Sequence, residues 1–253
     1  MSLLLVVALL LQTVGTPIAD GALIVSSGWP EFPALPQGAT PTPINDDWEL
    51  LYYEVATRSD AYVIQGEIRN TSSNPLETPT IIVTFADGGQ MGIHPDIDQA
   101  DSGQRAPFRQ SINDEDLIMA MNQSQEIEFT GVCEYYNVIP AQAFAWNFRN
   151  VEIEYDAARS AVRASGTVTN VGDAPAENYA PMLFGFTEDG HYVGSINARE
   201  VPANILSGDQ FEFEMDHGFD SFSSDRPFSG AGRGAVFVLA MAPPVYVSVD
   251  CVG

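Results

Sequence analysis

The chain of 253 residues contains no lysine, and arginine supplies all ten of its basic residues. It carries 34 aspartate and glutamate residues, so the formal net charge is −24 at neutral pH. A charge of that sign repels nucleic-acid phosphates and anionic lipid headgroups, which argues against both as partners. The acidic excess has four open interpretations: a solvated surface, adaptation to a salty medium, binding of divalent cations, and docking onto a basic partner.

Cysteine and histidine are also scarce. The sequence has two cysteines, Cys133 and Cys251, and none of His94, His191 and His217 has a cysteine or histidine at metal-ligand spacing. It lacks a Gly-x-Ser-x-Gly elbow and any Ser-His-Asp or Cys-His arrangement that spacing would support. We therefore expect a protein that is not an enzyme and that has no resident cofactor.

No apolar run reaches the roughly 20 residues of a transmembrane helix. Leu3 to Leu11 is an apolar run of nine residues, which suits the core of a signal peptide, although no basic residue precedes it. We expect residues 1–25 to be a secretion signal, with a retained N-terminal membrane anchor or a buried helix as alternatives. The expected location is extracytoplasmic: secreted, periplasmic or on the cell surface. Prolines recur through residues 26–44, which predicts an extended, semi-rigid linker.

A repeat is the most informative pattern that the sequence contains. Gly66 to Asn70 has a counterpart one hundred residues later in Gly166 to Asn170, and a proline stands five residues after each asparagine. An acidic turn follows in both copies, at Asp87-Gly88 and at Asp189-Gly190. Such spacing indicates two copies of one folding unit, which we place at residues 45–148 and 149–253. We expect the strand glycines to allow close packing and the asparagines to tie turns.

Both copies have the residue pattern of β-strands. The predicted strands, rich in β-branched and aromatic residues, are 48–55, 62–69 and 80–85 in the first copy and 151–155, 211–215 and 235–241 in the second. The one good helix candidate is Asp114 to Met121, which has acidic residues at its amino end. We predict an all-β protein of two tandem immunoglobulin-like β-sandwiches.

Three stretches of each copy resemble the FxLYD domain: a Gly-x-x-x-Asn strand end, an apolar strand closing before an acidic Asp-Gly turn, and a polar entry into another strand. They are residues 63–70, 81–92 and 124–129 in the first copy and 162–170, 182–194 and 206–213 in the second. The signature core differs, since Val83 to Asp87 lacks the Leu-Tyr-Asp. The resemblance covers most of residues 47–250. It implies an immunoglobulin-like sandwich on exported or membrane-anchored prokaryotic proteins, with no catalytic residues to carry over.

Two candidate sites stand apart from the repeat. Asp96, Asp98 and Asp101 cluster near a glycine, and Ca²⁺ takes six to eight oxygen ligands, so this loop is either a calcium site or simply solvated. Cys133 and Cys251 would form a disulfide in an oxidising compartment, or they are two separate buried thiols.

These features predict a non-enzymatic extracytoplasmic protein, a surface or accessory subunit of an envelope assembly with protein partners. The alternative is a cell-surface module that binds Ca²⁺ or a small ligand. An enzyme is a third hypothesis, and no residue pattern in the sequence supports it.

Overall fold

The structure is a computed structural model that describes residues 21–57, 62–112, 115–123, 127–133, 145–156, 161–218 and 235–244. Within these ranges the chain is mostly β-strand with one short helix, which confirms the predicted all-β class. Each of the six predicted strand ranges falls inside an observed strand. The described ranges contain no helix that is long and apolar enough to cross a membrane.

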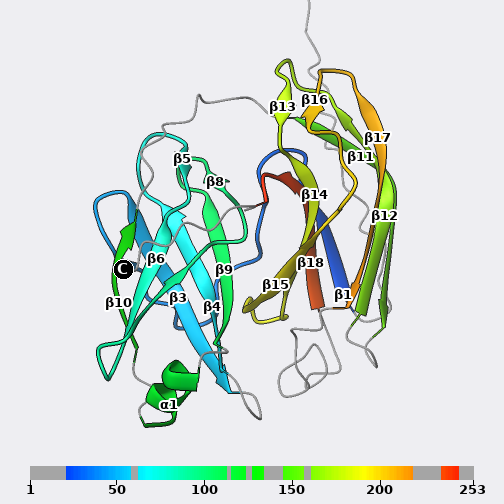
Figure 1. Ribbon diagram of the computed structural model, residues 1–253. Coiled ribbons are helices and arrows are strands. Elements are labelled where there is room, and N and C mark those ends of the chain that lie inside the picture. The colour runs from blue at the N-terminus through cyan, green and yellow to red at the C-terminus, as the bar shows by residue number, and fades with distance from the viewer. Residues whose placement is uncertain are drawn as a thin grey trace, which may run out of the picture.

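Two sheets form a first sandwich, coloured from blue to green in Figure 1, with the strand orders β2-β3-β4-β9 and β10-β6-β7. Their strands are β2 (Thr42–Pro43), β3 (Trp48–Thr57), β4 (Tyr62–Asn70), β6 (Thr80–Phe85), β7 (Gln90–Ile93), β9 (Arg105–Ile112) and β10 (Ile127–Cys133). The short strands β5 (Leu76–Glu77) and β8 (Gln99–Ala100) pair with each other. Helix α1 (Glu115–Gln123) lies between β9 and β10 in the chain and has two acidic residues in its first turn, as predicted.

A second sandwich has the strand orders β1-β18-β14-β15 and β11-β12-β17. Its strands are β1 (Gly21–Val25), β11 (Trp146–Asp156), β12 (Ala161–Asn170), β14 (Ala180–Phe186), β15 (Tyr192–Asn197), β17 (Gln210–Gly218) and β18 (Ala235–Ala242). The short strands β13 (Ala176–Glu177) and β16 (Asn204–Ile205) pair in the same way as β5 and β8. Apart from β1 and β2, the strand orders of the two parts correspond, with β3-β4-β9 matching β11-β12-β17 and β10-β6-β7 matching β18-β14-β15.

Strand β1 corrects the expectation that residues 1–25 form one export or anchor segment. Residues 21–25 pair in parallel with residues 235–239 of β18, so they belong to a sheet of the second sandwich. Leu23 and Val25 contact the core of that sandwich, whereas Ile24 contacts the core of the first. The apolar residues Leu23, Ile24 and Val25 belong to a strand with two partly buried faces, while residues 1–20 lie outside the described part of the chain.

The Pro-rich residues 26–44 also differ from expectation, because they lie against the sandwiches instead of forming a free stalk. The ring of Phe32 meets Phe184 edge to face, with centroids 5.1 Å apart. Gln104 Nε2 donates a hydrogen bond to the Pro30 carbonyl at 2.8 Å, and Arg105 Nη1 donates to the Pro33 carbonyl at 2.5 Å. These two side chains satisfy the carbonyl groups of Pro30 and Pro33 and hold this part of the segment in place.

The repeat asparagines hold equivalent turns. Each side-chain nitrogen donates to two backbone carbonyls, and each side-chain oxygen accepts from the backbone N–H two residues later. The carbonyl partners are those of Asn74 and Ala100 for Asn70, and those of Ala174 and Ile205 for Asn170. Both asparagines are fully buried, which makes the complete set of partners necessary.

The repeat glycines lie where there is no room for a side chain. A Cβ on Gly66 would lie 2.8 Å from the ring of Phe108, and one on Gly166 would lie 3.0 Å from the ring of Phe213. Each phenylalanine is the cross-strand partner of its glycine, so its ring covers the glycine in both copies. In the acidic turns after Asp87 and Asp189, Gly88 and Gly190 have φ angles of +88° and +87°, a conformation that favours glycine.

The four larger sheets are stacked, and β14 shows how the two sandwiches meet (Figure 1). All seven residues of β14 are buried. Leu183 packs in the second core, whereas Met182, Phe184 and Phe186 pack in the cluster that includes the first sandwich. The sheet β1-β18-β14-β15 is therefore buried on both faces, between β2-β3-β4-β9 on one side and β11-β12-β17 on the other.

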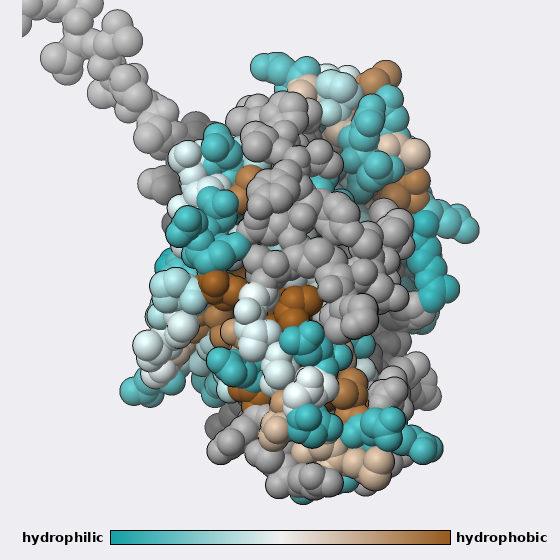
Figure 2. Space-filling view, turned by 60° about the vertical axis from the view of Figure 1, so that its left-hand side comes forward, coloured by the Kyte–Doolittle hydropathy of each residue, from teal (hydrophilic) through white to brown (hydrophobic). Residues whose placement is uncertain are grey.

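The visible outer surface has no broad apolar area over the described residues. In Figure 2 the hydrophobic residues form small groups among hydrophilic ones. The described ranges expose four large hydrophobic side chains, and these lie on separate parts of the fold: Tyr53, Met119, Val171 and Leu206. Isolated apolar residues of this kind are ordinary on protein surfaces, so they do not indicate a binding face.

Candidate functional site

Charged and polar side chains are buried where the two sandwiches meet, between β3, β4 and β9 on one side and β15 on the other. On β4, Ile64 and Ile68 point into the first core, and by strand alternation Gln65 and Glu67 point toward β15. Glu67 is fully buried and Gln65 nearly so. A carboxylate taken out of water costs several kcal/mol unless it is paired, so the partners of Glu67 decide what this site does.

Arg105 of β9 pairs with Glu67 through two parallel hydrogen bonds. Arg105 Nε and Nη2 lie 2.6 Å from the two carboxylate oxygens, the bidentate geometry that guanidinium and carboxylate groups favour. Burial raises the pKa of the Glu67 carboxyl, and Arg105 and the Tyr52 hydroxyl act in the opposite direction. The Arg105 guanidinium also lies over the ring of Phe32, 5.6 Å from its centroid. One arginine thus joins β4, β9 and the Pro-rich segment.

Asp96 makes a second buried contact between the sandwiches. It lies between β7 and β8, and its carboxylate accepts hydrogen bonds from the hydroxyls of Tyr192 and Ser195 on β15, the latter at 2.6 Å. Burial raises the pKa of the Asp96 carboxyl, and the two hydroxyls oppose that shift. Burial and the neighbouring Asp96 raise the pKa of Tyr192 well above its ordinary value, so its phenol keeps its proton and donates.

A third contact comes from β3. The backbone N–H of Tyr192 donates to the Tyr52 hydroxyl at 2.7 Å, and burial raises the pKa of that phenol. The imidazole of His191 packs edge to face on Tyr52, with its Nδ1 3.3 Å from a carboxylate oxygen of Glu54. Glu54 also accepts a hydrogen bond from Gln65. The contact surface is therefore held by a connected network of polar groups.

The chemistry of this network is structural. Within the sheet β2-β3-β4-β9, Arg105 pairs with Glu67 and Gln65 donates to Glu54, whereas Asp96 accepts from the hydroxyls of Tyr192 and Ser195 on the opposing strand β15. The hydrogen bonds of Asp96 and Tyr52 to β15 span the two sandwiches and hold them in one orientation, because sliding would leave these polar groups without partners. The arrangement therefore positions two sandwiches relative to each other.

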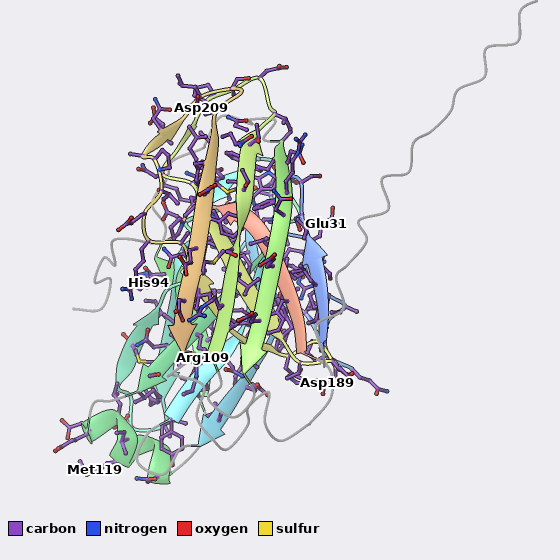
Figure 3. All side chains as sticks on the ribbon, turned by 90° about the vertical axis from the view of Figure 1, so that its right-hand side faces the viewer. Glu31, His94, Arg109, Met119, Asp189 and Asp209 are labelled. Atoms are coloured by element: carbon purple, nitrogen blue, oxygen red, sulfur yellow. The ribbon has the colours of Figure 1, made fainter. Side chains whose placement is uncertain are left out.

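A separate cavity of about 780 Å³ lies along β17, lined by residues of the sheet β11-β12-β17, which faces the viewer in Figure 3, and by residues at the end of β15 and just after it. Its lining has one basic residue, Arg199, and five acidic residues: Glu152, Glu200, Glu212, Glu214 and Asp216. Asp216 is paired with Arg163 at 2.7 Å, and both of these side chains are more than half exposed. The cavity is open and acidic, in contrast to the closed network between the sandwiches.

The residues of the calcium hypothesis do not come together. Asp96 is turned toward the hydroxyls of β15, and the Asp101 carboxylate accepts from the Ser102 backbone N–H at 2.7 Å. The Asp98 N–H donates to the Pro243 carbonyl, and desolvation and Glu77 raise the pKa of the Asp98 carboxyl. Across the described ranges, no group of three or more His, Cys, Asp or Glu side chains is arranged to hold a metal ion.

The cysteine hypothesis lies partly outside the described residues. Cys133 ends β10, and Cys251 falls after the last described residue. Their pairing stays a prediction.

Sequence analysis did not identify the buried network. Strand β4 alternates core-facing residues with the polar residues Gln65, Glu67 and Arg69. This alternation is the pattern of a strand with one solvent-facing side, so it does not indicate that the polar side is covered. The covering partner, β15, is more than one hundred residues later in the chain. One available signal was the group of arginines on β9 at Arg105 and Arg109, next to the acidic residues of β4 and β3.

The comparisons with known proteins give no family for this chain. No protein-family model matches it, and no curated protein matches it. The resemblance to the FxLYD domain stays a prediction from the residues that carry it.

The raised pKa of Asp96 gives a prediction for stability against pH. Folding raises this pKa, so the folded state holds the proton more tightly than the unfolded chain does. The stabilisation is complete below the ordinary aspartate pKa of about 3.9 and is lost as the pH rises through the raised folded value. Asp96→Asn keeps an oxygen acceptor for Tyr192 and Ser195 but does not titrate. We therefore expect the stability of this variant to fall less steeply as the pH rises. Thermal melts of both proteins from pH 4 to 8 measure it, and parallel curves would contradict the assignment.

Proposed function

We propose that the chain is a non-enzymatic structural or interaction protein outside the cytoplasm, built of two tandem immunoglobulin-like sandwiches that act as one rigid body. The observation that carries this proposal is the double burial of the sheet β1-β18-β14-β15. Its aromatic residues Phe184 and Phe186 pack in one apolar cluster with the first sandwich, and Tyr192 and Ser195 of β15 donate hydrogen bonds to Asp96. An interface with a packed apolar centre is typical of permanent association, not of transient domain contact.

Two further observations support the interaction role. The described buried titratable groups of the network are engaged with one another, which is how a structural contact uses such groups. The exposed face of the second sandwich is strongly acidic, and with a net charge of −24 the chain is suited to a basic protein surface. The extracytoplasmic location rests on the apolar run from Leu3 to Leu11 and on the family resemblance.

Co-purification from the native envelope tests this proposal. A tagged full chain is isolated after gentle solubilisation, and mass spectrometry gives the stoichiometry of the proteins retained. We expect one defined set of partners at a constant ratio, retained through successive purification steps. A chain that purifies alone under these conditions contradicts the role as a subunit. The alternative role in calcium binding finds no assembled ligand set among the described residues.

A further inference from the structure

We propose that the free edge of β17 is a strand-addition site that binds an extended segment of a partner protein in which basic and apolar residues alternate. The inference deepens the proposed interaction function and rests on it. It follows from the pairing of β17, from a comparison of the two sandwiches, and from the residues that line the cavity at this edge.

Among the residues that the structure describes, β17 is an edge strand whose outward backbone groups have no backbone partner. It is the outer strand of the sheet β11-β12-β17, and within the described residues it pairs with β12 alone. Figure 3 shows it as the lateral strand of this sheet, with Asp209 labelled just before its first residue. In an antiparallel strand, alternate residues point their N–H and C=O groups away from the paired neighbour. An open edge of this kind is a template for another strand.

The first sandwich shows what occupies the equivalent edge. There the chain covers β9 with its own backbone: Pro95 forms a bridge to Phe108, and the Asp96 N–H donates to the Pro107 carbonyl at 2.8 Å. The Pro107 carbonyl therefore points away from β4.

The two edges can be compared position by position. Phe108 pairs with Gly66 as Phe213 pairs with Gly166, which makes Glu212 the counterpart of Pro107. By this equivalence, Glu212 and, two residues on, Glu214 direct their backbone groups away from β12. In the second sandwich no described backbone segment bonds to these groups, and the cavity lies beside them.

The lining of the cavity defines the pattern of the added strand. Side chains on one face of such a strand would meet the carboxylates of Glu212 and Glu214 on the outer side of the sheet. Side chains on its other face would meet Phe213, Met215 and Ile196, which also line the cavity. Because successive residues of a strand point to opposite faces, the complementary segment alternates basic and apolar residues.

Charge separates this partner from a second copy of the chain. The chain has no lysine and a net charge of −24, so another copy would bring further negative charge to an acidic edge. The comparison with the first sandwich points the same way. There the segment that covers β9 carries the acidic Asp96, and β9 carries the basic Arg109. At the position equivalent to Arg109, β17 has the acidic Glu214, so the complementary segment is basic. The segment that binds here comes from a basic protein.

A synthetic peptide tests the site in the full chain. The probe is acetyl-Lys-Val-Lys-Val-Lys-Val-Lys-amide, added to ¹⁵N-labelled protein at low salt, with amide shifts and hydrogen exchange as the readout. We expect saturable shifts centred on β17 and slower exchange of the Glu212 and Glu214 amides. A peptide of the same length with glutamate in place of lysine, and one with alternate backbone amides methylated, are expected not to bind.

Two matched substitutions at one position separate backbone pairing from charge. Glu212→Pro removes the outward N–H and one charge at a position where the first sandwich carries Pro107, so the ladder to β12 stays intact. We expect it to weaken peptide binding about tenfold or more. Glu212→Gln keeps the N–H, and its loss is expected to be about two- to threefold and to shrink in high salt.

Three results would overturn the site: no binding of the lysine peptide, equal binding to Glu212→Pro and to the unmodified chain, or shifts that fall outside β17. A constant-ratio partner in co-purification together with any of these results refutes the edge site and leaves the interaction function standing. The absence of any partner refutes the function itself.

Discussion

Replacing Arg105 by methionine is expected to lower the free energy of unfolding by about 3–5 kcal/mol. The substitution removes both hydrogen bonds to the fully buried carboxylate of Glu67 and the bond to the Pro33 carbonyl. The Glu67 carboxylate is then left buried without its arginine. It takes up a proton, and this protonation restores part of the lost free energy of unfolding. Urea unfolding at pH 7, followed by tryptophan fluorescence, measures the change.

The control for Arg105 is an ion pair of the same kind on the surface. Arg163→Met removes the pair with Asp216, whose two side chains are more than half exposed, and we expect little measurable change in stability. The double variant Arg105→Met/Glu67→Leu removes the stranded charge as well, so it should recover much of the loss. If Arg105→Met were no more damaging than Arg163→Met, the interface would not depend on this pair.

Phe184→Ala is expected to cost about 3–5 kcal/mol of stability. The Phe184 ring is fully buried, and it lies on the face of β14 that points away from the second core, against Phe32. If the two sandwiches were joined only loosely, this ring would be half exposed and its removal would matter little. Urea unfolding with the same fluorescence readout gives the value.

The matched control is Thr84→Ala, one hundred residues earlier on β6. Thr84 occupies the same outward-facing side of its strand, but it is only half-buried because no third sheet covers it there. We expect a loss below about 1 kcal/mol. Comparable losses in the two variants would mean that the outer face of β14 is not a buried interface.

The repeat allowed much of the fold to be predicted, because it reports local structure. The strands, the turns tied by Asn70 and Asn170 and the close approach at Gly66 and Gly166 all follow from residues near each other or from the pairing of adjacent strands. Strand β1 was not predicted. It pairs in parallel with residues more than two hundred positions later in the chain, and nothing in its local sequence specifies that partner.

The difference between the two copies is also a long-range property. The outer positions of β6 include Thr84, whereas those of β14 include Phe184 and Phe186, and one hundred residues separate Thr84 from Phe184. Phe85, in contrast, packs within the core of the first sandwich. From sequence alone both strands are apolar runs that end in an aromatic residue, and only the stacking of sheets shows that one of them has two buried faces.

The candidate site shows the same limit. Asp96 was singled out as part of an acidic loop, and it is a partly buried residue with structural contacts. Its true partners, Tyr192 and Ser195, lie about one hundred residues away on β15. The spacing of residues in the sequence can identify a set of metal ligands when all of them come from one loop. It says little about contacts between residues of different sandwiches.

Carboxylate–amine cross-linking of the co-purified assembly is the most direct test of the proposal that the chain binds a basic partner through the second sandwich. Because the chain contains no lysine, any zero-length cross-link from its carboxylates to a lysine identifies another protein. We predict cross-links concentrated at Glu152, Glu212, Glu214 and Asp216. Cross-links confined to the first sandwich, or an assembly that yields none, would contradict the proposal.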